Sequence, residues 1–129
     1  MQSDEPVTRY LLQKDHFNRQ RGYAKARAFL PPADGKTSVY RIQGLKDCEV
    51  WSLGRDNVAS SRGRELLGRA DLLCRQVNER GLAVIADPPP PRHANIEGWP
   101  EKAQQMSIAQ RLAADAKLVV IEEREGIGG

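Results

Sequence analysis

Cysteine and long apolar runs are scarce in this sequence. The 129 residues include two cysteines, Cys48 and Cys74, which stand 26 residues apart with no Cys-x-x-Cys pair. Two isolated thiols do not build a disulfide scaffold, and a structural zinc site normally shows paired ligand spacing. The longest apolar run, Leu82–Ala86, has five residues, whereas a membrane-spanning helix needs about 20. We therefore expect neither a disulfide-rich protein, nor a metal site, nor a membrane span.

Familiar catalytic motifs are also missing. The chain has no Gly-x-Ser-x-Gly, no His-Glu-x-x-His, no Gly-x-x-x-x-Gly-Lys and no Gly-x-Gly-x-x-Gly. These absences argue against the usual hydrolases, metalloproteases, nucleoside triphosphatases and dinucleotide enzymes, and no cofactor is expected. The polar, acidic segment 1–6 has no apolar stretch behind it and is not a signal peptide. Together with the low cysteine content, this favours a cytoplasmic location.

The composition allows one small domain with a modest core. Leu, Ile, Val and Phe total 28 residues, or 22% of the chain, just above the level at which chains stay disordered. Charged residues make up 29%, the net charge is +3, and 14 Arg outnumber 6 Lys. The arginine excess has two interpretations. It reflects either selection for binding phosphate or carboxylate groups or the residue usage of a GC-rich bacterial genome.

Four segments have the residue pattern of β-strands. Thr37–Gln43 is the clearest, because β-branched and aromatic residues dominate it and a turn signal, Ala33–Lys36, precedes it. In Thr8–Lys14, the side chains of Tyr10 and Leu12 are expected on one face. The other two candidates are Leu82–Ala86 and Leu118–Ile121.

Three segments are expected to be helical. Asp47–Leu53 has an acidic first turn and is followed by Gly54, which we expect to stop the helix. Over Leu66–Arg80, apolar residues recur at helical spacing, and Gly81 supplies a stop. The clearest helix is Glu101–Lys117, which a proline opens.

These elements predict an α+β or α/β fold in which about three helices pack on a sheet of three or four strands. The step from helix through Gly81 to strand is typical of an α/β connection. Four consecutive prolines, residues 88–91, are expected to form an extended polyproline segment, and residues 92–99 an irregular loop. We expect one domain over residues 1–129, with flexible tails at 1–6 and 122–129.

A basic stretch, residues 9–27, is the first candidate site. It holds six cations and one acid, Asp15, interleaved with Tyr10, Phe17 and Tyr23. Positive charge with aromatic spacing is what single-stranded nucleic acid needs. The other interpretation is a solvated basic face whose aromatic rings point into the core. The candidate binding residues here are Arg9, Arg19, Arg21, Lys25 and Arg27.

Residues 92–99 are the second candidate site, expected as a loop that enters the N-terminus of the last helix. Helix N-termini attract anions because their N–H groups are unpaired. Arg92 would bind a phosphate or carboxylate, His93 would exchange a proton, and Asn95 would orient a ligand beside Trp99. In the structural alternative, His93 and Asn95 satisfy backbone groups and Trp99 packs in the core.

Several functions are compatible with these patterns. The leading hypothesis is a small cytoplasmic binding or accessory protein that recognises an anionic partner, namely nucleic acid, a nucleotide or an acidic protein surface. One alternative is an enzyme acting on a phosphate ester or nucleotide, with His93 as acid/base, Arg92 as charge stabiliser and His16 as partner. Another is an obligate subunit of a toxin–antitoxin or defence-type assembly, which would expose an apolar patch around residues 101–117. The oligomeric state stays open.

Overall fold

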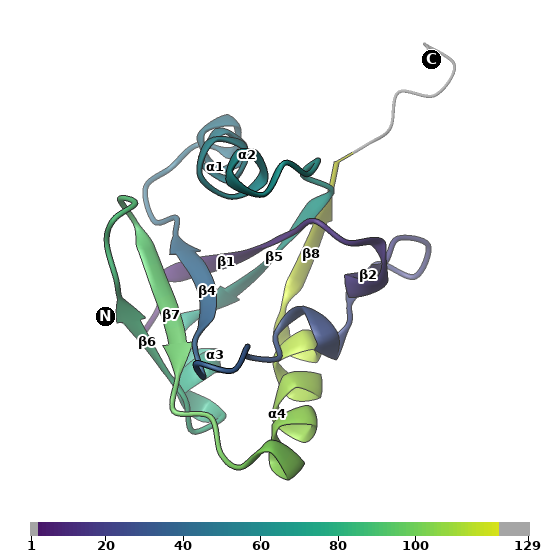
Figure 1. Ribbon diagram of the computed structural model, residues 1–129, viewed down its shortest axis with the longest axis vertical. Helices are drawn as coiled ribbons and strands as arrows, with labels where there is room; N and C mark the ends of the chain where they lie inside the picture. Colours follow the sequence, from purple (N-terminus) through teal and green to yellow (C-terminus); the bar gives the residue numbers. More distant parts are fainter. Residues whose placement is uncertain (1–2, 122–129) are drawn as a thin grey trace.

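Six antiparallel strands form the sheet on which the rest of the chain packs. The computed structural model describes residues 3–121, and its strands are ordered β6-β7-β4-β1-β5-β8 across the sheet (Figure 1). The expected α+β class is confirmed, but the sheet has six strands where three or four were predicted. The strands are β1 (Pro6–Leu11), β4 (Thr37–Arg41), β5 (Gly68–Leu73), β6 (Ala83–Ala86), β7 (His93–Glu97) and β8 (Lys117–Val120).

Helices cover both faces of the sheet. On one face lie α3 (Cys74–Glu79) and α4 (Lys102–Asp115); on the other lies a continuous helical segment made of α1 (Asp47–Gly54), η3 (Arg55–Ala59) and α2 (Ser60–Arg62) (Figure 1). Strand alternation divides the core between the two faces: Val7 and Leu11 pack with Leu112 of α4, whereas Tyr10 and Leu12 pack beneath α1, as predicted. The short elements are η1 (Lys14–His16), β2 (Phe17–Asn18), β3 (Tyr23–Ala24) and η2 (Ala26–Ala28).

The long helix expected over Leu66–Arg80 is wrong. Its first part is strand β5, and only the six residues of α3 are helical. All six residues of β5 pair with β1, and four of them also pair with β8. Alternation places Ala70 and Leu72 in the core beneath α3 and α4, and turns Arg69 and Asp71 toward the other face. Two strands from elsewhere in the chain thus decide the conformation of this segment.

The first helix continues past the glycine expected to stop it. Gly54 has a helical φ of −67°, the helical path extends to Arg62, and Gly63, with a φ of 61°, ends it. Gly54 is instead a point of close approach to the sheet, because a Cβ there would lie 2.6 Å from Cδ1 of Tyr10. The Tyr10 hydroxyl donates a hydrogen bond to the Val50 carbonyl, which ties the helix to β1.

Residues 92–99 are not the expected loop. His93–Glu97 forms strand β7, which pairs with β4 on one side and β6 on the other. The four prolines are part of the connection between β6 and β7 and are not a freely extended segment; the His93 N–H donates to the Pro90 carbonyl there. The α/β connection expected at Gly81 is also wrong, since β6 runs antiparallel to its neighbour, although Gly81 follows α3 with the positive φ of a helix stop, 81°.

Part of the segment expected as a flexible leader belongs to the sheet. Pro6 opens β1, and the buried Glu5 carboxylate accepts a hydrogen bond from Arg41 Nε at 2.7 Å. The Glu5 carbonyl also accepts the N–H of Cys74. The expected tail at 122–129 lies outside the described residues. Over residues 3–121 no helix combines the length and the apolar character that crossing a membrane requires.

The close approach at Gly54 predicts whether a substitution there stabilises or destabilises the fold. In an exposed helix, Gly→Ala stabilises by about 1 kcal/mol, but Gly54→Ala is expected to destabilise by about 1–3 kcal/mol because its methyl group overlaps the Tyr10 ring. Urea unfolding measures the difference. The matched control is Ser52→Ala at an exposed position of the same helix, expected within about 0.5 kcal/mol of the parent. A stabilised Gly54→Ala variant would contradict this packing.

Candidate functional site

The candidate site lies where strands β1 and β4 separate. β1 pairs with β5 along all six of its residues, but it pairs with β4 only at Val7 and Thr8. The next side chain, Arg9, occupies the opening: its Nε donates to the Ala28 carbonyl at 2.8 Å and its Nη1 to the Ser38 carbonyl at 2.9 Å. One guanidinium group therefore links β1 to β4 and to η2, in a place where ladder hydrogen bonds have ended.

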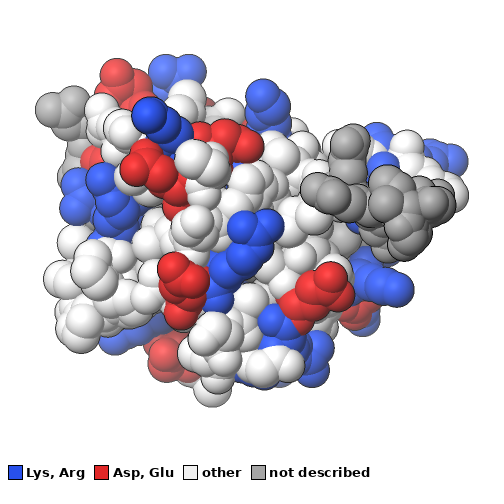
Figure 2. Space-filling model, turned by 90° about the horizontal axis from the view of Figure 1, so that it is seen from above, with Lys and Arg blue, Asp and Glu red and all other residues white. Residues whose placement is uncertain are grey.

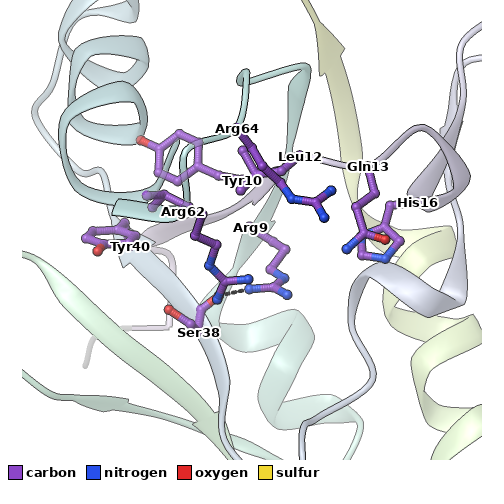
Figure 3. A pocket seen from close by; sticks show the side chains of 10 residues that line it. Arg9, Tyr10, Leu12, Gln13, His16, Ser38, Tyr40, Arg62 and Arg64 are labelled. Carbon is purple, nitrogen blue, oxygen red and sulfur yellow. Dashed lines mark hydrogen bonds between the residues drawn. The ribbon is translucent and has the colours of Figure 1, made fainter. Parts of the chain in front are cut away.

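A pocket of about 150 Å³ opens beside Arg9 (Figure 3). Three arginines and a histidine line it together with polar and apolar side chains, and none of the lining residues is acidic. Figure 3 shows the Arg62 guanidinium beside that of Arg9, next to Ser38, with Arg64 and His16 further along. The lining residues are Arg9, Tyr10, Leu12, Gln13, His16, Ser38, Tyr40, Val58, Arg62 and Arg64.

The arginines of the pocket differ from the other arginines in their partners. No carboxylate within residues 3–121 forms an ion pair with Arg9, Arg62 or Arg64. The positive φ of Gly63 turns the chain between the last two, so that both project from the end of α2 toward the pocket. The paired arginines are Arg27 with Asp15, Arg41 with Glu5, Arg69 with Asp47 and Asp71, and Arg80 with Asp115.

Burial, with a smaller contribution from neighbouring positive charge, shifts the pKa of two groups in the pocket. Burial and then the charge of Arg62 lower the pKa of the Arg9 guanidinium to about 10, so the group stays charged at neutral pH. Burial also lowers the pKa of His16 below its usual 6.5; Asp15 opposes this shift, and Arg9 and Arg27 add to it. A bound anion would favour the charged form of both groups, so the pocket is suited to a negative ligand.

A chain of hydrogen bonds begins at Ser38. Its Oγ lies 2.8 Å from Nε2 of His93, and Nδ1 of His93 lies 2.8 Å from the backbone oxygen of Asp87. Asn95 donates from Nδ2 to the Asp87 carboxylate at 2.9 Å. The Tyr40 ring packs at a tilt against His93, with 5.3 Å between ring centroids. The hydroxyl of Ser38 is thus held between the arginine pocket and a buried face of the sheet.

The helix-mouth site predicted around Arg92 and His93 is not present. His93 is the first residue of β7 and Arg92 precedes it, so the rest of that strand lies between them and the segment leading into α4. Arg92 donates to the carbonyls of Arg41 and Gln43, outside the pocket. Asn95 is buried, and Trp99 packs against the core with its indole N–H on a backbone carbonyl, which is the structural alternative for Trp99.

The basic stretch 9–27 is divided among several places. Of its three interleaved aromatic residues, Tyr10 and Phe17 are in the core and Tyr23 is 45% exposed. Arg19 donates to the carbonyl of Ile121, and Arg27 pairs with an acid. Arg21 is exposed and Lys25 is half-buried. On the face of the molecule drawn in Figure 2, cationic and anionic side chains are intermixed.

The two histidines both come to the pocket region, His16 as part of its lining and His93 through Ser38. Sequence reasoning identified these histidines and Arg9 but did not single out Ser38, Arg62 or Arg64. A usable signal was present in Arg62-Gly63-Arg64, where two cations flank a glycine after a helix. Nothing in the local sequence predicted that this turn would lie over β1 and β4.

The titration of His16 is expected to show its burial. The NMR signal of its ring should titrate with a pKa below 6.5, and His16→Gln identifies the signal. Because the folded-state pKa is lowered, the stability linked to this group is present above pH 6.5 and is lost as the pH falls below that value. A midpoint at or above 6.5 would contradict the buried, cation-rich setting.

Comparisons with known proteins provide no precedent for this arrangement. No protein-family model, curated protein or solved structure matches the chain. The function is therefore inferred from the chemistry of the pocket itself, in which three guanidinium groups without carboxylate partners surround a space of about 150 Å³.

Proposed function

We propose that the protein binds the phosphate group of a small phosphate ester or nucleotide in the pocket between β1, β4 and the end of α2. The observation that carries this proposal is the convergence of the Arg9, Arg62 and Arg64 side chains on one space with no acid in its lining. Positive charges that lie close together repel one another, and a bound anion offsets that repulsion.

The hydrogen-bonding groups of the pocket favour phosphate. A guanidinium group presents several N–H donors in a planar fork that matches two phosphate oxygens. Within residues 3–121 the Arg62 and Arg64 guanidinium groups donate no hydrogen bond to a protein group and form no ion pair, so they are available for this contact. Ser38, Tyr40 and Gln13 add neutral polar groups to the lining.

The size of the pocket selects the part of the ligand that enters. Pockets that enclose whole drug-sized ligands have volumes of about 300–1,000 Å³, and this one has about 150 Å³. It therefore encloses a phosphoryl group, while the remainder of the ester or nucleotide stays at the mouth. A pocket of this size differs from the extended groove that tracks a nucleic-acid backbone, which favours a small ligand over a long strand.

The subunit hypothesis finds less support in the surface. The large apolar side chains exposed on the described part of the chain are Tyr23, Ile85 and Met106, and they belong to β3, β6 and α4. The buried residues of α4 are Ala109, Leu112 and Ala113. The pocket is accordingly the feature on which the functional proposal rests.

Arginine substitutions test the proposed ligand. Calorimetry with inorganic phosphate and pyrophosphate is expected to show saturable binding that Arg62→Gln and Arg64→Gln each weaken about tenfold, since a hydrogen bond to a charged group contributes about 1.5–3 kcal/mol. The control Arg111→Gln removes the same charge from an exposed position on α4 and should leave the affinity unchanged.

The outcomes of that experiment separate the ligand classes. Equal losses in all three variants would indicate a diffuse charge effect and overturn the pocket assignment. Tight binding of single-stranded RNA that survives Arg62→Gln and Arg64→Gln, with no phosphate binding, would favour a nucleic-acid surface elsewhere. Absence of phosphate binding at millimolar concentration in low salt would reject the proposal.

Proton linkage provides an independent prediction. A phosphate anion in the pocket favours the imidazolium form of His16, so the pKa of His16 should rise when phosphate is added. NMR titration with and without phosphate measures this shift, and Arg62→Gln should reduce it at equal phosphate concentration. An unchanged His16 titration under saturating phosphate would place the bound ion outside this pocket.

A further inference from the structure

The side chain of Ser38 faces two environments at once. Its residue lines the arginine pocket, and its hydroxyl contacts the imidazole of His93 at 2.8 Å. Ser38 is on β4, next to β7, and the register places it opposite Asn95, with Tyr40 opposite His93. The pairing of these two neighbouring strands therefore fixes the position of the hydroxyl relative to the imidazole.

The hydrogen bonds of His93 determine its tautomer. A backbone carbonyl can only accept, so the 2.8 Å contact with the Asp87 oxygen requires a proton on Nδ1. In the neutral ring Nε2 is then unprotonated, and the Ser38 hydroxyl must donate to it. This is the arrangement in which an imidazole can remove the proton of a hydroxyl nucleophile.

The surroundings of His93 also stabilise the cation that proton removal would create. The Asp87 carboxylate lies 3.7 Å from Nδ1 and is oriented by the Asn95 amide at 2.9 Å. The Tyr40 ring packs against the imidazole. Asp87 and Asn95 are positioning residues in this arrangement, because they act on Ser38 only through the imidazole.

We propose that Ser38 is a nucleophile, activated by His93, that hydrolyses a phosphate monoester whose phosphoryl group occupies the arginine pocket. The inference rests on the proposed phosphate binding and adds a reaction to it. Arg9 and Arg62 lie beside Ser38, where their charges can stabilise the phosphoryl oxygens as the reaction proceeds (Figure 3). Phosphoryl transfer depends mostly on such positioning and charge stabilisation.

The reaction balances with water as the only co-reactant. Ser38 Oγ attacks phosphorus while its proton passes to Nε2 of His93, and the ester P–O bond breaks. The departing alkoxide takes that proton and leaves as an alcohol, with the phosphoryl group on Ser38. Water, losing a proton to the neutral His93, then attacks phosphorus and breaks the P–Oγ bond. The proton returns to Oγ, and inorganic phosphate leaves.

The absence of a Gly-x-Ser-x-Gly turn does not conflict with this role. That motif exposes a serine at the top of a strand-to-helix turn, whereas Ser38 is half-buried on a strand and lines the pocket where β1 separates from β4.

The test uses the full chain with p-nitrophenyl phosphate, an aryl ester whose ring can remain at the mouth of the pocket. Nitrophenolate release measures turnover, and mass spectrometry after acid quenching detects a phosphoryl adduct on Ser38. Ser38→Ala is expected to abolish both while retaining phosphate binding by calorimetry. His93→Gln should lower kcat by about 10²–10⁴-fold, the usual contribution of a general base.

Two further variants separate a chemical role from a structural one. Ser52→Ala, at an exposed position on α1, is the matched control and should keep the parent rate. Asp87→Asn keeps the backbone carbonyl that orients His93 but removes the charge, so it should lower kcat with little change in KM. Thermal unfolding of each variant shows whether it is folded; if Ser38→Ala unfolds, Ser38→Cys replaces it and should lower turnover while permitting phosphate binding.

The results distinguish this inference from the proposed function. Phosphate binding by the parent chain without nitrophenolate release or an adduct would overturn the nucleophile and leave the binding function intact. Turnover that persists in folded Ser38→Ala, or a parent-like kcat in folded His93→Gln, would also overturn it. If the parent chain neither binds phosphate nor hydrolyses the ester, both proposals fail.

Discussion

The side chain of Arg9 bridges the point at which the sheet opens, and the pocket depends on that bridge. Beyond Thr8 the ladder between β1 and β4 ends, which would leave carbonyl groups without partners. The Arg9 guanidinium satisfies one of them, on Ser38 of β4, and also donates to the carbonyl of Ala28 in η2. Hydrogen bonds to the backbone therefore hold a positive charge in the opening, whether or not a ligand is bound.

The distribution of ion pairs determines where positive charge is neutralised and where it is not. Arg41 and Arg80 have carboxylate partners, and Arg69 has two and also lies 4.6 Å above the Trp51 ring. These contacts join elements of the fold and neutralise the cations that form them. At the pocket, Arg62 and Arg64 add charge to Arg9 with no acid in the lining. The net charge of +3 for the chain therefore does not indicate the local electrostatic potential. That potential depends on which arginines have no carboxylate partner.

Sequence reasoning reached part of the candidate site and misplaced another part. Arg9 and His16 were identified in a basic stretch and do line the pocket. His93 was identified for its chemistry, but the expected loop at a helix N-terminus is an interior strand, and its imidazole contacts Ser38, 55 residues away in the chain. Such contacts follow from strand order, which no local pattern specified. For the aromatic residues of the basic stretch, the alternative in which the rings point into the core agrees with the burial of Tyr10 and Phe17, whereas Tyr23 is exposed.

Some elements were determined by the residues of their own segment. The turn before β4 and the positive φ of Gly81 follow from neighbouring residues, and so does α4 after its proline. Tertiary structure decided residues 68–73 and 93–97. The first segment pairs with β1 and β8, both distant in sequence, and the second pairs with the distant β4 as well as with β6. It also decided that Gly54 would face Tyr10 rather than end a helix. The pocket belongs to this second group, since it exists only where β1 leaves β4 and the end of α2 passes over the opening.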